Sequence, residues 1–349
     1  MLRQGKIRYG GLKALDCELK KASWAGARYI VLVDENTFKC CLPYLVSRVG
    51  SLQEAEFIEV PVGEECKSME VAAQVWQVLL EGGADRQAVL VCLGGGSVCD
   101  LGGFVAAAYK RGIRHINIPT TLLSMVDAAI GGKTAINFGD VKNSLGFFYP
   151  AEITVIEPVF LSTLSPDEWL NGRLEMVKTA AVTDPVLFNS LVATENIQPP
   201  IFNFQLKQVA RIKARVVKAD PYDFSIRKIL NFGHTFGHAI EVYARQSHGV
   251  SVGIGMLAAM YLSVKKTGLP EEVHNTYSQW LKRQLSPIGN QLPTFTLKDI
   301  EQMLPLMYQD KKNAVGELRC VLLQELGAAV IDVVVDDNEV RDAFLKLGR

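Results

Sequence analysis

The chain has 349 residues, of which 48% are hydrophobic and 21% are charged, the composition of a globular protein. Lysine and arginine together number 37, as do aspartate and glutamate, so the formal net charge is zero. This balance excludes a broad basic field that would recruit nucleic acid or an anionic membrane, and an anionic substrate would need a local basic site. No apolar run is long enough to span a bilayer, no secretory pattern opens the chain, and the seven cysteines form no CxxC pair. We therefore expect a cytoplasmic protein that binds neither membrane nor nucleic acid.

The first half of the chain has the pattern of a parallel α/β sheet. Short apolar runs alternate with helical patterns and predict buried strands at residues 29–33, 57–60, 88–93, 115–118 and 153–156. After about residue 158 strand patterns nearly disappear and long amphipathic segments follow. Because so long a chain exceeds what one core usually serves, we expect two domains. These are an α/β Rossmann-like domain over residues 1–157 and a mostly α-helical domain over residues 158–349.

Two predicted strands of this half end in residues suited to a nucleotide. The first strand is followed by Asp34 and Asn36, where a carboxylate could accept hydrogen bonds from ribose hydroxyls. Another ends in the run Gly94-Gly95-Gly96, whose backbone N–H groups could approach a pyrophosphate at the start of a helix. Cys99 stands where the third glycine of G-x-G-x-x-G would be. A glycine-rich turn needed only for packing is therefore the alternative.

Residues 119–146 combine hydroxyls, amides and lysines with apolar side chains. The segment includes Pro119-Thr120-Thr121, Gly131-Gly132-Lys133 and Lys142-Asn143. It is too polar for a packed helix and too apolar for a disordered linker, which predicts a loop that lines a site. Lysines beside glycine and asparagine suit a phosphate or a carboxylate. A solvated surface loop is the alternative.

The helical half begins with a segment that places charged residues on one helix face. Amphipathic patterns predict helices at residues 167–179, 205–218 and 232–245, then a strand pair within 321–335 and a closing helix from about Asn338. In the first of these helices Glu168, Glu175 and Lys178 lie on roughly one face, since their offsets are seven and three. A surface ion pair between Glu175 and Lys178 is the alternative.

Three of the five histidines, His234, His238 and His248, lie within fifteen residues. His234 and His238 are four apart and share a helix face, and His248 lies beyond the end of that helix. Two imidazoles with a carboxylate such as Glu175 would leave an open coordination position on zinc, as a catalytic metal requires. Lys213, Arg227 and Asn231 continue the polar face toward His234. Ordinary core or surface histidines are the alternative.

Taken in order, these motifs resemble the 3-dehydroquinate synthase family of the sugar-phosphate cyclases. The likeness runs from about Asp34 to Gly327. It is carried by Gly94-Gly95-Gly96 with Asp100, the run Pro119-Thr120-Thr121-Leu122-Leu123 to Asp127, Gly131-Gly132-Lys133-Thr134, Lys142-Asn143, Glu175-Met176-Val177-Lys178 and Leu230-Asn231-Phe232-Gly233-His234-Thr235-Phe236-Gly237-His238-Ala239. The resemblance implies an NAD-binding N-terminal domain, a helical metal-binding C-terminal domain and a homodimer.

The resemblance also implies a role for each matching position. The ligands of a zinc or cobalt ion would be Glu175, His234 and His248. The NAD site would be lined by Asp34, Asn36, Glu64, Lys67, Gly95, Gly96, Asp100, Thr120, Thr121, Asp127 and Lys142. The substrate would be held by Lys133, Asn143, Lys178, Lys213, Arg227, Asn231 and His238, with Arg111 reaching its phosphate from the neighbouring subunit. Either Lys311 or Lys312 would also enter the site.

The reaction implied is the conversion of 3-deoxy-D-arabino-heptulosonate 7-phosphate to 3-dehydroquinate and phosphate, a step of the shikimate route to aromatic amino acids. Transient oxidation by NAD would be followed by phosphate elimination, re-reduction and an intramolecular aldol closure. Lys133 with Arg227 favours a substrate that bears a carboxylate. The alternatives are another cyclase, of the 2-deoxy-scyllo-inosose or 2-epi-5-epi-valiolone synthase type, and a metal-dependent polyol dehydrogenase. A metabolite sensor without catalysis would have lost a ligand or a lysine, and none is lost.

Four positions depart from the family's pattern. Where it usually has Glu, Glu and Gly after the aspartate that corresponds to Asp220, this chain has Pro221, Asp223 and Ser225. Before the metal-binding glutamate, Leu174 replaces the usual Ala or Gly. We expect Asp223 to keep a hydrogen bond with a shorter reach.

Overall fold

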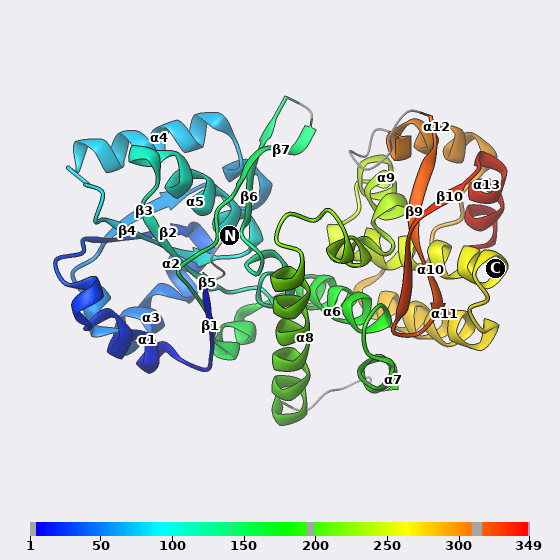
Figure 1. The fold of residues 1–349 in the computed structure, drawn as a ribbon, viewed down its shortest axis with the longest axis horizontal. Helices are drawn as coiled ribbons and strands as arrows, with labels where there is room; N and C mark the ends of the chain where they lie inside the picture. Colours follow the sequence, from blue (N-terminus) through cyan, green and yellow to red (C-terminus); the bar gives the residue numbers. More distant parts are fainter. Residues whose placement is uncertain (1–4, 140, 194–198, 309–315, 348–349) are drawn as a thin grey trace. The chain divides into compact units, whose positions relative to one another are not determined.

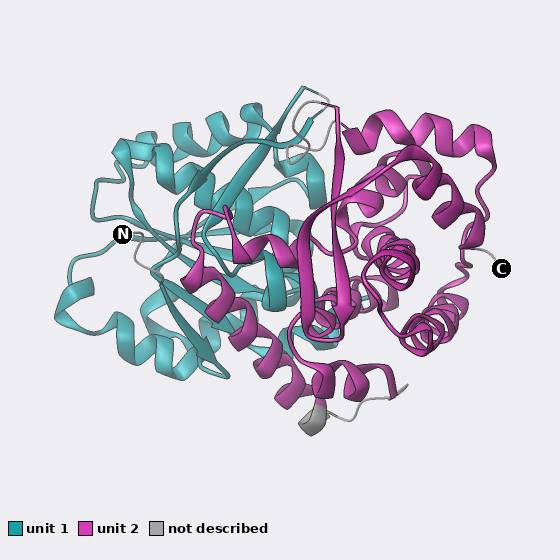
Figure 2. Cartoon of the chain, turned by 45° about the vertical axis from the view of Figure 1, so that its right-hand side comes forward, with its two compact units in different colours: residues 1–165 teal, residues 166–349 magenta. Residues whose placement is uncertain are grey.

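The computed structural model describes residues 5–139, 141–193, 199–308 and 316–347. It divides into two compact units, residues 1–165 and 166–349 (Figure 2). The first is an α/β unit and the second is mostly helical, which confirms the predicted fold class. The boundary expected after residue 157 falls just before the short helix η6 (Pro158–Thr163), which lies in the first unit.

A six-stranded parallel sheet forms the centre of the first unit (Figure 1). Its order is β1 (Lys6–Tyr9), β8 (Ile153–Ile156), β5 (Arg114–Pro119), β4 (Val89–Gly94), β2 (Tyr29–Asp34) and β3 (Glu56–Val60). The five predicted strands are confirmed. The sixth strand, β1, was not predicted, because it is short and half of its residues are basic. β4 is buried at all six positions, because a parallel sheet is covered on both faces.

Helices pack on both faces of this sheet. Figure 1 shows α4 (Met69–Glu81) and α5 (Gly96–Ala108) on one side, and α1 (Leu12–Leu19) and α3 (Leu42–Arg48) on the other. The short helix α2 (Glu35–Cys40) follows β2 directly. One core cluster contains Leu32 of β2 and Leu90 of β4, two neighbouring strands, together with Leu79 of α4 and Val105 of α5. Because β4 ends at Gly94 and α5 begins at Gly96, the start of α5 lies at the carboxyl edge of the sheet.

The prediction of a loop over residues 119–146 is wrong for the second half of this segment. Residues Lys133–Phe138 (β6) and Val141–Phe148 (β7) form an antiparallel hairpin. Thr134 and Ile136 are buried while Lys133 is exposed, an alternation typical of a strand. The period is blurred in the sequence, because the buried position Thr134 is polar and its less buried neighbour Ala135 is apolar. The first half contains η5 (Ser124–Ala128), a single turn of π-helix.

His115 on β5 gives the α/β unit a predicted sensitivity to acid. Its ring is buried, stacks on Tyr149 at 5.5 Å and has no hydrogen bond among the described residues. Burial lowers the pKa of His115 to about 4, below its ordinary 6.5. The unfolded chain therefore binds more protons between these values, so stability is complete above about 6.5 and is lost as the pH falls toward 4. We expect wild type to lose about 2 kcal/mol more than His115→Phe between about pH 7 and pH 5 in urea unfolding. Equal losses in both proteins would contradict this.

The second unit is a set of helices with one hairpin. The predicted helices are confirmed as α6 (Pro166–Ala181), α8 (Pro199–Ala219), α9 (His234–Ala244) and the closing α13 (Asp337–Lys346). The predicted strand pair is confirmed as β9 (Leu318–Glu325) and β10 (Ala328–Val335). The remaining helices that the structure describes in this unit are α7 (Pro185–Ala193), η7 (Ile226–Asn231), α10 (His248–Lys266), α11 (Glu271–Leu285), η8 (Ser286–Ile288) and α12 (Leu297–Tyr308). Within the described ranges, none of the helices combines the length and the apolarity that crossing a membrane demands.

Candidate functional site

Three predicted metal ligands converge from three helices of the second unit. Glu175 lies on α6, His234 begins α9 and His248 begins α10. Oε1 of Glu175 lies 3.9 Å from Nε2 of His234 and 3.7 Å from Nε2 of His248, and one ligand atom from each residue falls within 4.8 Å of the others. These separations suit one ion held by three ligand atoms, and three protein ligands are the set typical of a catalytic zinc site, whose fourth position takes water or substrate.

The surroundings of Glu175 fit a cation. Its side chain is 1% exposed, and neither carboxylate oxygen has a hydrogen bond among the described residues. Oε2 forms an ion pair with Lys178, which is equally buried, so the surface ion pair considered as the alternative is not what the fold contains. A buried carboxylate oxygen is costly without a partner, and a divalent ion bound to Oε1 would supply one.

Close helix packing brings the two histidines to this carboxylate. A Cβ added to Gly255 of α10 would lie 2.2 Å from the carbonyl oxygen of Gly233 and 2.6 Å from the amide nitrogen of Gly237. A Cβ added to Gly249 would lie 2.4 Å from Cα of Asn171 on α6. Only glycine permits backbones this close, so α10 contacts both α9 and α6. The convergence of the ligands depends on these contacts.

Leu174, one of the departures from the family pattern, has a local explanation. Its side chain is fully buried, and a Cβ at Gly253 of α10 would lie 2.7 Å from its Cδ2. The bulk of Leu174 therefore fills the space beside a glycine, and the neighbouring Glu175 keeps its place.

His238 lies beside two of the predicted metal ligands, and three further predicted polar residues belong to the same unit. The ring centroid of His238 lies 5.2 Å from that of His234 and 6.0 Å from that of His248. Lys213 of α8 and Arg227 of η7 are buried, and Nδ2 of Asn231 has no hydrogen bond among the described residues. Buried cations in a chain of zero net charge are suited to an anionic substrate.

The loop that carries three of the departures is organised by Asp220. The buried carboxylate of Asp220 accepts hydrogen bonds from the backbone amides of Phe224 (3.1 Å), Ser225 (2.7 Å) and Arg227 (3.1 Å). Burial raises the pKa of Asp220, but these amides outweigh it and hold the pKa below its ordinary value. Nη1 of Arg227 donates to the carbonyl of Pro221 at 2.9 Å. Asp223 has φ of 62°, a conformation unusual outside glycine.

We expect Asp220→Ala to release this loop and with it Arg227. The variant should lose about 2 kcal/mol of unfolding free energy and, if Arg227 binds the substrate as predicted, roughly 10- to 100-fold in kcat/KM, chiefly through KM, because the arginine would no longer be held in place. Urea unfolding and steady-state kinetics measure the two effects. Asp220→Asn, which keeps one acceptor oxygen, should fall between wild type and alanine. A variant with normal kinetics and lowered stability would show that Asp220 only supports the fold.

In the first unit, the residues predicted for a nucleotide lie at the carboxyl edge of the sheet. Asp34 ends β2, the glycine run follows β4 and Thr120 follows β5, and these are neighbouring strands. The amide of Thr120 donates to the carbonyl of Gly94 at 2.9 Å, and a Cβ at Gly95 would lie 3.1 Å from Cγ2 of Thr121. Gly96 begins α5, and Asp127 lies in η5. This edge therefore presents a helix N-terminus beside hydroxyls.

Asp34 also has a structural role that the sequence did not suggest. Its carboxylate accepts from the amide of Thr37 at 2.8 Å and forms a capping box at the start of α2, in whose first turn Asn36 lies. This capping fixes the carboxylate at the strand end.

A polar network joins other predicted residues of this unit. Buried Lys67 donates to Oδ2 of Asp100 at 2.7 Å and also to the side chain of Asn143. Burial lowers the pKa of Lys67, but Asp100 and Glu64 outweigh it and raise the pKa, so the ammonium stays charged. Asn137, which the sequence did not single out, accepts from the amide of Asn143 at 2.8 Å and donates to Glu64 at 2.9 Å.

Two predicted lysines, an arginine and one undecided pair remain to be placed. Lys133 begins β6 and Lys142 lies in β7, both exposed. Arg111 precedes β5, so it lies at the amino edge of the sheet, opposite Thr120 and its neighbours. Lys311 and Lys312 lie outside the described residues.

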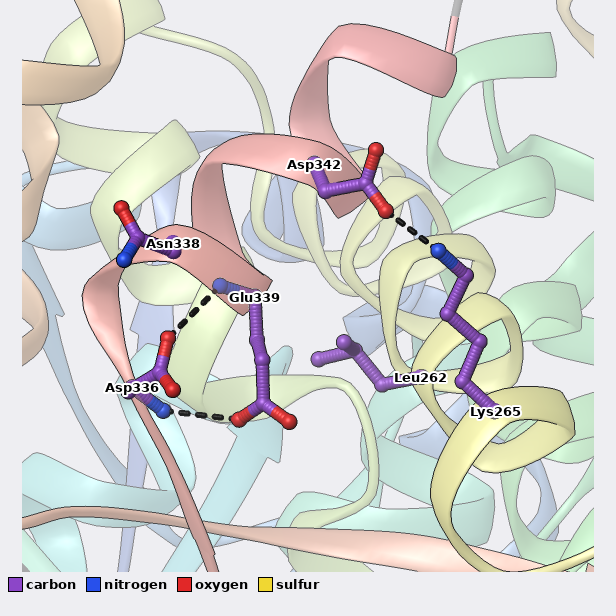
Figure 3. Close-up of a pocket in the computed structure, with 6 residues that line it drawn as sticks. All are labelled: Leu262, Lys265, Asp336, Asn338, Glu339 and Asp342. Carbon is purple, nitrogen blue, oxygen red and sulfur yellow. Dashed lines mark hydrogen bonds and ion pairs between the residues drawn. The ribbon is translucent and has the colours of Figure 1, made fainter.

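A pocket of the second unit, away from the predicted site residues, is closed by its own polar groups. About 260 Å³ in volume, it is lined by Leu262, Lys265, Asp336, Asn338, Glu339 and Asp342 (Figure 3). Lys265 pairs with Asp342, and Asp336 with Glu339 forms the capping box of α13. Its polar groups thus bind one another, and it contains no predicted site residue.

Family models match most of the chain. The family model for the 3-dehydroquinate synthase N-terminal region matches residues 57–171, and that for the C-terminal region matches residues 172–313. The 3-dehydroquinate synthase of Parabacteroides distasonis is 36% identical over 326 residues, which cover 91% of this chain and 90% of that protein.

Two solved structures share the fold. One is a 2-epi-5-epi-valiolone synthase from Streptomyces hygroscopicus subsp. jinggangensis with NAD⁺ and Zn²⁺ bound, with TM-score 0.86, 26% identity and coverage of 99% of this chain and 97% of that one. The other is a 2-deoxy-scyllo-inosose synthase complexed with carbaglucose-6-phosphate, NAD⁺ and Co²⁺, with TM-score 0.84, 21% identity and coverage of 97% and 96%. With family models over most of its length and a relative above 30% identity, this chain belongs to the 3-dehydroquinate synthase family.

Proposed function

We infer that this chain is an enzyme that converts 3-deoxy-D-arabino-heptulosonate 7-phosphate to 3-dehydroquinate and phosphate. One observation carries the inference: the cluster of Glu175, His234 and His248 beside buried Lys178, in a chain 36% identical to a 3-dehydroquinate synthase over 91% of its length. The reaction belongs to the biosynthesis of aromatic amino acids.

The residues present fit the two groups that this chemistry needs. Glu175, His234 and His248 would hold a zinc or cobalt ion, and the glycine run with Asp34, Asp100 and their neighbours would hold NAD. When bound, the ion supplies polarisation of substrate hydroxyls and NAD supplies a reversible hydride acceptor, which is not consumed because the hydride returns.

The chain's own side chains would bind and orient the substrate. We propose that Lys133, Asn143, Lys178, Lys213, Arg227, Asn231 and His238 hold it. The burial of Lys178 supports this role. Its side chain is 1% exposed, and water screens the attraction of a buried cation for an anion only weakly. Such cations would stabilise the charge that develops on the departing phosphate. Nδ2 of Asn231, which has no hydrogen bond within the described part of the chain, could donate to a substrate hydroxyl.

Substrate choice within the cyclases rests on the carboxylate. Lys133 and Arg227 together suit a carboxylate-bearing substrate, whereas the other cyclases would use a different sugar phosphate. The similarity to a 3-dehydroquinate synthase, 36% identity over 91% of this chain, also favours the carboxylate-bearing substrate.

We also propose a cytoplasmic homodimer in which Arg111 reaches the phosphate held by the neighbouring subunit. Its backbone supports a special role, since Lys110 and Arg111 have φ of 49° and 68°, and strain of this kind is retained where function over-determines it. The seven cysteines are all free, as a reducing compartment permits. Sedimentation equilibrium of the full chain tests the dimer.

The test of function is release of phosphate coupled to formation of 3-dehydroquinate from the heptulosonate phosphate, with NAD and Zn²⁺ or Co²⁺. Turnover that stops on chelation, resumes on adding metal and leaves no net NADH is the expected result. Turnover only with a sugar phosphate lacking the carboxylate would favour another cyclase. Steady NADH accumulation with a simple polyol would favour a dehydrogenase.

A further inference from the structure

His248 is the least enclosed member of the metal cluster. Its side chain is 36% exposed, against 11% for His234 and 1% for Glu175. It is also the first residue of α10, directly after the loop from α9. An exposed imidazole ring can rotate, and fixing it with Nε2 toward Glu175 costs conformational entropy. This cost weakens metal binding unless the protein has already fixed the ring.

The backbone on both sides of His248 is fastened to α6 by Asn171. Its Oδ1 accepts from the hydroxyl of Ser247 at 2.6 Å and from the amide of Val250 at 3.2 Å. Asn171 lies one turn before Glu175, so the start of α10 is tied to the helix that presents the carboxylate. The freedom that remains at His248 is therefore that of its side chain.

Glu241 of α9 holds that side chain. Its Oε2 lies 2.9 Å from Nδ1 of His248, and its own side chain is 13% exposed. A carboxylate can only accept, so Nδ1 carries the hydrogen and the lone pair of the neutral ring is at Nε2, the atom 3.7 Å from Oε1 of Glu175. The corresponding contact of His234 is weaker, because its Nδ1 lies 3.3 Å from the neutral carbonyl oxygen of Phe232.

We propose that Glu241 is a positioning residue of the metal centre, which fixes the tautomer and the orientation of His248 and makes its Nε2 a stronger ligand. Ligating histidines commonly donate their second nitrogen to such a partner. The inference rests on the proposed function, since it takes the cluster to be a metal site. It adds a residue that does not touch the metal.

Metal affinity of the full-length chain tests this role without reference to turnover. Each protein is stripped of metal, and its affinities for Co²⁺ and Zn²⁺ are measured by competition with a chelator, together with the visible spectrum of the Co²⁺ form. Glu241→Ala should weaken metal binding by roughly 10- to 100-fold and alter the Co²⁺ spectrum. Glu241→Gln keeps an acceptor without the charge and should lie between alanine and wild type. Glu272→Gln, a substitution at an exposed position of α11, should match wild type.

Thermal unfolding of the metal-free proteins separates positioning from folding. Because Asn171 secures the backbone, metal-free Glu241→Ala should melt within a few degrees of wild type. The proposal is overturned if Glu241→Ala binds metal as tightly as wild type, or if Glu241→Gln is as weak as alanine while both melt far below wild type. Wild type that binds no metal at all would instead refute the proposed function.

Discussion

Replacing Glu175 by alanine is expected to abolish tight metal binding and to lower kcat/KM by about 10⁴-fold or more. The carboxylate is the one anionic member of the cluster, and the same substitution leaves the ammonium of Lys178 buried without its counter-ion. Uncompensated burial of a charge also costs about 3 to 5 kcal/mol of unfolding free energy. The variant should therefore fail in both chemistry and stability.

A second substitution separates these two losses. Glu175→Gln keeps the size and an oxygen of the side chain but removes its charge, so it should fold better than alanine and still bind metal far more weakly than wild type. Atomic absorption measures the metal content, urea unfolding the stability and phosphate release the activity. Glu272→Ala on α11 provides a glutamate control. Full activity of Glu175→Gln with no bound metal would mean that the cluster is not the catalytic centre.

The sequence contains much of the fold because the relevant patterns are local. A short continuous apolar run such as residues 88–93 is typical of a strand that is covered on both faces, and β4 is buried throughout. Long segments of helical period gave α6, α8 and α9 for the same reason. The β6–β7 hairpin was not predicted because one buried position of β6, Thr134, is polar, so the alternation of apolar and polar residues is weak in the sequence.

The metal cluster was accessible from sequence for a different reason. Histidine is rare in this chain, so three within fifteen residues is informative, and the resemblance supplied the distant Glu175. No spacing rule could have supplied Glu241, Asn137 or Asp220. Each acts through hydrogen bonds to residues that only the folded backbone brings into reach, as with the 2.9 Å contact between Glu241 and His248.

The glycines between α9 and α10 show how packing that carries no chemistry controls the site. Gly233, with φ of 79°, is the N-cap of α9, and its carbonyl oxygen is the atom nearest to a Cβ built on Gly255. Both histidine ligands begin the helices that cross here. A small increase in the distance between these helices would therefore separate His234 from His248.

We expect Gly255→Ala to destabilise the chain by about 4 kcal/mol and to weaken metal binding at least about tenfold. Alanine gains about 1 kcal/mol over glycine in helix propensity, but its methyl would lie 2.2 Å and 2.6 Å from backbone atoms of Gly233 and Gly237, which no side-chain rotation can relieve. Urea unfolding and chelator competition measure the two effects. Gly50→Ala is the matched control, because its Cβ would come no nearer than 3.8 Å to another atom, the side-chain oxygen of Asp16. If Gly255→Ala were as stable as this control and bound metal normally, α9 and α10 would have to tolerate a wider crossing, and the close approach would not be what aligns the ligands.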